Sequence, residues 1–204
     1  MEERVKRTIA ALQKHQMGAQ YVETAADVVR VLEGMLHEGD VVTVGGSVTL
    51  GQCGVLEHLR SGRYSFLDRY EDGADVDEIF RDAFYADAYI TSTNAVTEDG
   101  LLVNMDGNAN RVAAMAFGPA RVVVVAGINK IVPDEPAAQK RIHAVAAPKN
   151  AARLHCDTPC AKTGKCENCR RDNPGSICCT YVAQGMQRKP GRIQVILVGE
   201  SLGY

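Results

Sequence analysis

Small polar side chains gather in one stretch of the chain, residues 86–111, and their types suit the binding of a small ligand. Two short apolar runs in this stretch lead into polar residues, which include Asn94 after the first run and Asp106 after the second. Asn110 and Arg111 follow, directly before an apolar pattern with helical spacing. Because open α/β sheets bind ligands beyond the carboxyl ends of their strands, we interpret this stretch as one wall of a binding site.

Two charged residues of the stretch could take part in chemistry. Arg111 could hold a carboxylate or phosphate through two parallel hydrogen bonds, with Asn110 as a second hydrogen-bonding group. The alternative is an ion pair between Arg111 and a nearby acid, and both interpretations stay open. Glu98 lies in a TEDG turn and is the best candidate for a catalytic base or nucleophile. Its competing interpretation is a solvated turn acid.

A glycine turn follows another apolar run, where Gly45, Gly46 and Ser47 come directly after residues 40–44. Glycines let a ligand approach the backbone closely, and free N–H groups at a helix start favour an anion. The alternative is a tight strand-to-helix turn that Ser47 caps. The turn lacks the full dinucleotide pattern and the P-loop lysine, so we find no nucleotide cofactor motif.

Asn129 and Lys130 follow residues 121–126, which contain four consecutive valines and are predicted to form a central parallel strand. In an α/β topology these two residues fall on the same edge of the sheet as the glycine turn. Lys130 could neutralise an anionic ligand there, or it could be an exposed loop lysine.

Segments typical of strands alternate with amphipathic helical patterns, which predicts an α/β fold with a mostly parallel open sheet flanked by helices. We expect a single domain over residues 1–204, with N-terminal helices in residues 1–38 and a cysteine-rich insertion at 155–191, before the last strand. The expected strands include 19–22, 40–44, 64–67, 121–126 and 192–198, and the expected helices include 2–16, 48–60 and 134–154, the last interrupted at Pro148.

The composition excludes some classes of function. The formal net charge is −2, which gives no pull toward nucleic acid or an anionic membrane. No apolar run approaches the length that spans a bilayer, and the first residues are charged, so we expect no membrane partner and a cytoplasmic location. Cytoplasmic thiols stay reduced, and the cysteines therefore need a role other than disulfides.

Six of the seven cysteines lie close together near the end of the chain. Their spacing, with three residues between one pair and two residues between another, suits zinc, and the same thiolates could hold an iron–sulfur cluster. Unligated loop cysteines are the alternative. A nucleic-acid knuckle would need interleaved aromatic residues, and only Tyr181 is near, so we do not expect nucleic acid as a partner. The predicted metal ligands are Cys156, Cys160, Cys166, Cys169, Cys178 and Cys179.

The chain resembles the lactate-utilization (LUD) domain family in several segments. They are VGGSVTL (44–50), ADAYITSTNAVTEDGLLVNMDGNANR (86–111), RVVVVAGINKIV (121–132), RI…AAPKNAARL (141–154), TPCAKTGKC..C (158–169) and IQVILVGESLGY (193–204). The resemblance implies a ribose-phosphate isomerase/CoA-transferase-like fold. It also implies a role linked to the oxidation of lactate to pyruvate, together with iron–sulfur partner proteins.

The TEDG turn is similar to the SENG turn that carries the glutamate nucleophile of CoA-transferases, which would give that role to Glu98. Thr97 and Asp99 depart from the CoA-transferase pattern. The leading hypothesis is a LUD-like protein that binds a small anion at the sheet edge and a metal at its cysteines. The alternatives are a transferase or isomerase that uses Glu98, and a non-enzymatic module with structural zinc.

Overall fold

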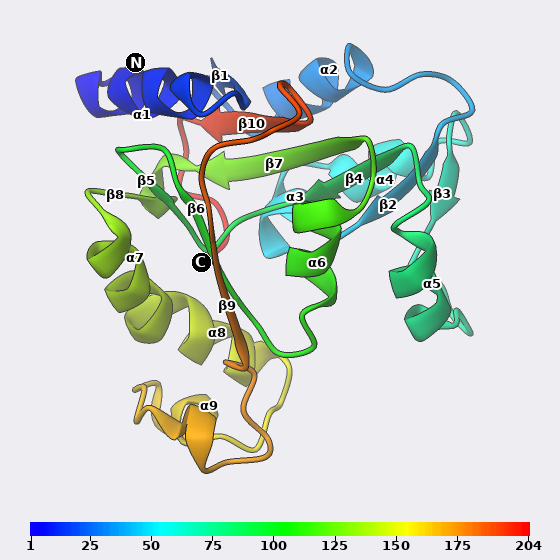
Figure 1. Cartoon of the computed structure of the whole chain (residues 1–204). Helices are drawn as coiled ribbons and strands as arrows, with labels where there is room; N and C mark the ends of the chain where they lie inside the picture. Colours follow the sequence, from blue (N-terminus) through cyan, green and yellow to red (C-terminus); the bar gives the residue numbers. More distant parts are fainter.

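A six-stranded parallel sheet forms the centre of the computed structural model, which describes residues 1–204 (Figure 1). The strand order is β1-β10-β7-β4-β2-β3, and every neighbouring pair is parallel. The predicted α/β fold with a parallel sheet is therefore confirmed. The strands are β1 (Gly18–Val22), β2 (Val41–Val44), β3 (Ser65–Leu67), β4 (Ala88–Thr91), β7 (Arg121–Gly127) and β10 (Ile193–Val198).

β7 lies inside this sheet, between β10 and β4, as its four valines predict. Successive side chains of a strand point to opposite faces. Val122 and Val124 accordingly belong to one apolar core, and Val123 and Val125 belong to another. A strand that is covered on both faces needs apolar side chains at every position, which is why the run is continuous.

Helices cover both faces of the parallel sheet. On the face of Val123, the core includes side chains from α2 (Asp27–Glu33), α3 (Val48–Gln52) and α4 (Val55–Leu59). On the opposite face, it includes side chains from α1 (Glu3–Lys14) and α6 (Asn110–Phe117). One more helix, α5 (Val76–Asp82), lies between β3 and β4 in the sequence and has no buried residue.

A second, mixed sheet of four strands lies beside the first, in the order β8-β5-β6-β9 (Figure 1). Its strands are β5 (Ala95–Thr97), β6 (Leu102–Asp106), β8 (Ile131–Val132) and β9 (Thr180–Gln184). A continuous helical segment packs against it through a small third core. This segment consists of α7 (Glu135–Arg141), a π-helical turn (Ile142–Ala146) and α8 (Ala147–Arg153).

Two predicted helices depart from a single regular α-helix in the structure. The helix expected over residues 48–60 is divided into α3 and α4, because Gly54 between them adopts a left-handed conformation with φ +68°. The helix expected over residues 134–154 changes to a π-helical turn directly before α8, which carries Pro148 in its first turn. Because proline has no N–H to donate to the preceding turn, the irregular turn falls at residues 142–146, before Pro148 rather than at it, and the helical path is not broken.

The cysteine-rich segment is only partly peripheral. Its first half contains α9 (Pro159–Thr163) and a 3-10 turn (Cys169–Arg171), which lie at the far end of the molecule from α1 (Figure 1). Its second half contributes β9, which pairs antiparallel with β6 over residues 102–106 and so satisfies the backbone groups of that edge. No helix of the structure combines the length and apolar character needed to cross a membrane.

Candidate functional site

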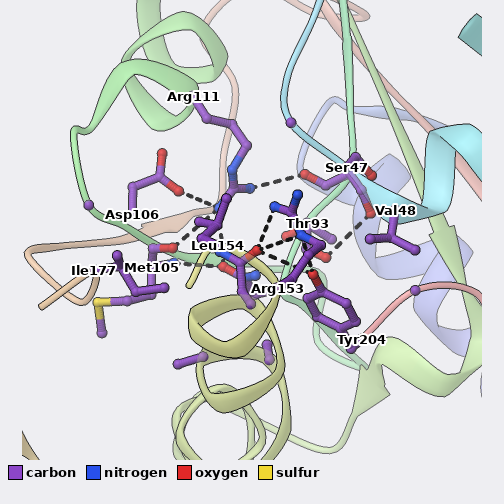
Figure 2. Close-up of a pocket in the computed structure, with 18 of the residues that line it drawn as sticks. Ser47, Val48, Thr93, Met105, Asp106, Arg111, Arg153, Leu154, Ile177 and Tyr204 are labelled. Carbon is purple, nitrogen blue, oxygen red and sulfur yellow. Dashed lines mark hydrogen bonds and ion pairs between the residues drawn. The ribbon is translucent and has the colours of Figure 1, made fainter. Parts of the chain in front are cut away.

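A cavity of about 240 Å³ opens where the carboxyl ends of the parallel strands meet the small sheet and α8 (Figure 2). Because all six strands are parallel, the loops that follow them share one edge of the sheet. The structure brings together at this cavity the following predicted ligand-binding residues: Gly46, Ser47, Asn94, Asp106, Asn110, Arg111 and Lys130.

The glycine turn after β2 forms one side of the cavity. Gly46 and Ser47 line it, and the Ser47 hydroxyl accepts a hydrogen bond from the Leu50 N–H at 3.3 Å, which caps α3. Gly45 does not line the cavity. It is buried beside β4. A Cβ atom added to Gly45 would lie 2.5 Å from Thr91 Oγ1 and 2.8 Å from the Tyr89 hydroxyl. The first glycine is thus required for packing rather than for access to a ligand.

Arg111 connects the two sheets at the floor of the cavity (Figure 2). Its Nη1 donates to the Ser92 carbonyl at 3.1 Å and to Asn104 Oδ1 at 2.5 Å. Its Nη2 donates to Asn94 Oδ1 at 3.1 Å and pairs with Asp106 Oδ1 at 2.5 Å. The guanidinium therefore holds the loop after β4 against the end of β6, and its charge is compensated by Asp106.

Asn104 is fully buried and completes this floor. Its Oδ1 accepts hydrogen bonds from Thr93 Oγ1 and from the Asn94 N–H, both at 3.1 Å, in addition to Arg111. These contacts fix the chain direction between β4 and β5, where the polar residues leave the parallel sheet and enter the small one. Asn104 stands in the polar stretch of the sequence, but only the folded chain shows that it organises the site.

Lys130 lies at the edge of the cavity with 3% of its surface exposed, so it is not the exposed loop lysine of the alternative interpretation. Its Nζ donates to Ser92 Oγ at 2.9 Å and to Thr49 Oγ1 at 3.0 Å. Burial, followed by the positive charges of Arg141 and Arg111, lowers the pKa of Lys130 to about 7.

Two further arginines line the cavity. Arg69 follows β3, and its guanidinium lies over the Phe80 ring, 4.6 Å from the centroid; its buried Nε has no hydrogen-bond partner. Arg153 belongs to α8, and its Nε donates to the Tyr204 hydroxyl at 2.7 Å. Neither arginine pairs with a carboxylate. Asp106 is the one acidic residue of the lining, so the cavity carries an excess of positive charge.

Glu98 does not line this cavity. It lies in the turn between β5 and β6, beside the N-terminal helix, where its carboxylate pairs with Arg7 Nη2 at 2.5 Å. The same turn is fixed by a close approach of Gly100 to the backbone of Ala11. The candidate reactive carboxylate is therefore separate from the group of polar residues at the strand ends.

Asn129 also stays outside the cavity, although it precedes Lys130. Its side chain bonds to the backbone of Leu202, with the amide nitrogen 3.4 Å from the carbonyl oxygen and Oδ1 3.1 Å from the N–H. This contact fixes the segment after β10, from which Gly203 and Tyr204 reach the cavity. Asn129 therefore shapes the site through the C-terminal segment.

The six cysteines near the end of the chain lie in one region of the fold, and Cys178 lines the cavity. Burial, followed by the neighbouring thiolates of Cys166, Cys160, Cys169 and Cys179, raises the pKa of Cys178 to about 11. The Sγ of Cys166 lies 3.3 Å from Nδ1 of His143. However, no three Cys, His, Asp or Glu side chains converge closely enough to hold a metal ion, so these positions do not by themselves form a metal site.

The sequence matches the model of the LUD domain over residues 5–198. The chain belongs to the LUD domain family. A comparison with curated proteins gives no match. The resemblance that the sequence motifs indicate is thereby confirmed for nearly the whole length of the chain.

One solved structure supports the fold of this LUD domain. A DUF162 family protein from Deinococcus radiodurans aligns with a TM-score of 0.54 and 15% identity, over 97% of both chains. Two others are more distant: eIF2B beta from Chaetomium thermophilum (TM-score 0.40, 17% identity, 55% of this chain and 44% of that one) and a variant of the decarboxylase AibA/AibB (TM-score 0.42, 13% identity, 86% and 88%). At these identities the likeness concerns the fold alone.

Several residues of the LUD domain site were missing from the sequence prediction. Arg69 could have been found, because it follows the predicted strand 64–67 and so lies on the same edge as the glycine turn. Tyr204 could have been found in the same way, from the last strand. Arg153 and Cys178 carry no such signal, since they reach the cavity only through the packing of α8 and β9 beside the parallel sheet.

Proposed function

We propose that this LUD domain binds a small anionic ligand, with a carboxylate or a phosphate group, in the cavity at the carboxyl edge of the sheet. The observation that carries the proposal is the charge of the lining: Arg69, Arg111 and Arg153 face a single acid, Asp106, which Arg111 already neutralises. Arg69 is half-buried and Arg153 is exposed, and neither has an acidic partner, so an anion that enters the cavity meets uncompensated positive charge.

The two arginines without acidic partners are the groups that would contact the ligand. Arg69 is held over the Phe80 ring, and its Nη1 lies so near the glycine turn that a Cβ atom on Gly46 would come within 3.4 Å of it. Arg153 approaches from α8 and keeps further N–H groups for a ligand. A planar guanidinium binds a carboxylate or phosphate through paired hydrogen bonds. Arg111 would serve as the positioning residue of the floor.

Titration calorimetry tests this proposal with a panel of lactate, pyruvate, ribose 5-phosphate and coenzyme A. At least one anion should bind to the wild-type protein, and Arg69→Ala should weaken its binding about 10-fold or more, because a charge-assisted hydrogen bond contributes roughly 1.5–3 kcal/mol. Arg188→Ala is the matched control, since Arg188 is exposed and does not line the cavity. Absence of binding, or equal losses in the two variants, would count against the proposal.

Membership in the LUD domain family supports a cellular role in lactate utilization, the oxidation of lactate to pyruvate. Lactate and pyruvate are both small carboxylates and match the charge of the cavity. In this role the protein would act together with an iron–sulfur partner protein. Co-purification of the tagged protein from cells grown on lactate, compared with cells grown on glucose, tests for such a partner.

The cysteine-rich segment supports a second proposal, the binding of zinc or an iron–sulfur cluster. The supporting observation is that the thiols of Cys160, Cys166, Cys169 and Cys179 are all close enough to Cys178 to raise its pKa. Loading would require these side chains to turn toward a common point. Metal analysis of protein purified without oxygen distinguishes the cases. About four iron atoms per chain and a brown colour indicate a four-iron cluster, whereas zinc without colour indicates a structural site. A protein that contains neither iron nor zinc would contradict the proposal.

A further inference from the structure

Lys130 has surroundings that are unusual for a lysine side chain. It is buried, and its Nζ is held by two hydroxyl groups, Ser92 Oγ at 2.9 Å and Thr49 Oγ1 at 3.0 Å. No carboxylate forms an ion pair with it. Gly203 closes the other side, where a Cβ atom would lie 3.5 Å from the Nζ. The amine is thus fixed in position at the wall of the cavity.

The charged groups around Lys130 favour its neutral form. Arg141 and Arg111 lie near it, and the only thiol that faces it, Cys53, is buried with a pKa raised to about 11 and stays uncharged at neutral pH. A buried amine near two guanidinium groups keeps a free lone pair at a pH where an exposed lysine is protonated, which is how enzymes activate a lysine nucleophile.

The cavity also provides a place for an anionic group beside this amine, since Arg69 and Arg153 line it. We propose that Lys130 forms a reversible imine with a carbonyl compound that carries an anionic group, either a 2-oxo acid or an aldose phosphate. The inference rests on the proposed anion site, because the arginines must hold the ligand while its carbonyl carbon meets the amine.

The chemistry balances without an additional reactant. The Nζ lone pair attacks the carbonyl carbon, a C–N bond forms, and the π electrons move to the oxygen. A proton then passes from nitrogen to oxygen, for which the hydroxyls of Ser92 and Thr49 are in contact with the Nζ. The hydroxyl group then takes the second proton of the nitrogen and leaves as water when the C–O bond breaks, while the nitrogen lone pair forms the C=N bond. Addition of water reverses the sequence.

Reductive trapping tests the inference. The wild-type protein is incubated at pH 7 with sodium cyanoborohydride and either pyruvate or ribose 5-phosphate, and modified lysines are mapped by peptide mass spectrometry. The neutral fraction of an amine of pKa 7 exceeds that of an exposed lysine by about a thousandfold at this pH. Lys130 should therefore be modified far faster than the exposed Lys140, and the two ligands distinguish the 2-oxo acid from the aldose phosphate.

The pH dependence and a variant give independent controls. Trapping at Lys130 should be half-maximal near pH 7, whereas modification of Lys140 should continue to rise up to pH 10. Lys130→Met should not form the adduct. If this variant does not fold, the positions of the modified lysines in the wild-type protein, and the pH dependence of their modification, test the inference. Modification spread evenly over the lysines would overturn the inference. If lactate and pyruvate both bind in the calorimeter but no adduct forms at Lys130, the imine is refuted and the anion site stands. If no anion of the panel binds, both the imine and the anion site are refuted.

Discussion

Arg111 Nη2 lies 2.5 Å from Asp106 Oδ1, and this ion pair decides the charge balance of the cavity. The pair uses the one acid of the lining, so that Arg69 and Arg153 remain without a counter-charge. The side chains of the pair are only 12% and 8% exposed, which makes the pairing far more important than one at the surface. The same guanidinium holds the loops of two sheets, and it therefore links the stability of the fold to the shape of the site.

Arg111→Ala should destabilise the protein by about 3–5 kcal/mol, because it leaves the buried carboxylate of Asp106 without its counter-charge and removes hydrogen bonds to Ser92, Asn94 and Asn104. Urea unfolding followed by circular dichroism measures the loss. The exposed control Arg188→Ala should change the stability by less than about 0.5 kcal/mol. A loss below about 1 kcal/mol for Arg111→Ala, as for a surface pair, would show that the hydrogen bonds of the floor are not formed.

The burial of Lys130 should make stability depend on pH. Its pKa falls from 10.5 in the unfolded chain to about 7 in the folded protein, so the unfolded state binds more protons between these values. Stability should therefore rise with pH, and the contribution of Lys130 should increase by about 2 kcal/mol between pH 7 and pH 9. Lys130→Met should lack this increase. The buried thiols of Cys53 and Cys178, whose pKa values are raised, lower the stability as pH rises, but they do so equally in the wild type and in Lys130→Met. The difference between the two proteins therefore reports Lys130 alone. Parallel pH profiles of stability would contradict the burial of Lys130.

The first glycine of the turn after β2 should be intolerant of a side chain. Gly45→Ala places a Cβ atom 2.5 Å from Thr91 Oγ1 and should destabilise the protein by about 1–3 kcal/mol. Gly51→Ala is the matched control, since a Cβ atom at that position in α3 meets nothing within 4 Å. It should stabilise the helix by about 0.5–1 kcal/mol. Equal unfolding midpoints for the two variants would contradict the packing of the turn.

Glu98→Gln should leave ligand binding unchanged, because Glu98 lies outside the cavity and pairs with Arg7. The loss of this half-exposed pair should cost at most about 1 kcal/mol. Calorimetric titration with the best anion of the panel measures the first effect, and urea unfolding measures the second. A large fall in the affinity of Glu98→Gln for the anion would show that Glu98 contributes to the binding site, and it would favour the transferase or isomerase alternative.

The sequence predicted the parts of the site that depend on local pattern. An apolar run followed by glycine or polar residues marks a strand end, and parallel strands bring such ends to one edge. Ser47, Asn94, Arg111 and Lys130 were found in this way, and they line the cavity together. The central position of β7 followed from its valines, since only a strand covered on both faces needs apolar residues throughout.

Contacts between distant parts of the chain were beyond such patterns. Nothing in the TEDG turn indicates that Arg7, 91 residues earlier, supplies the partner of Glu98. Arg153 reaches the cavity from a helix that packs on the small sheet, and β9 joins that sheet from within the cysteine-rich segment. Strand order and helix packing decide these relationships, and both depend on the burial of whole faces rather than on spacing within one segment.

A crystal structure of the protein with the tightest-binding anion of the panel tests the central claim most directly. The account predicts electron density for the ligand in the cavity at the carboxyl edge, with its anionic group in contact with the guanidinium groups of Arg69 and Arg153 and with Arg111 still paired to Asp106. Density for the ligand at another surface, or in the cavity with neither Arg69 nor Arg153 in contact, would contradict it.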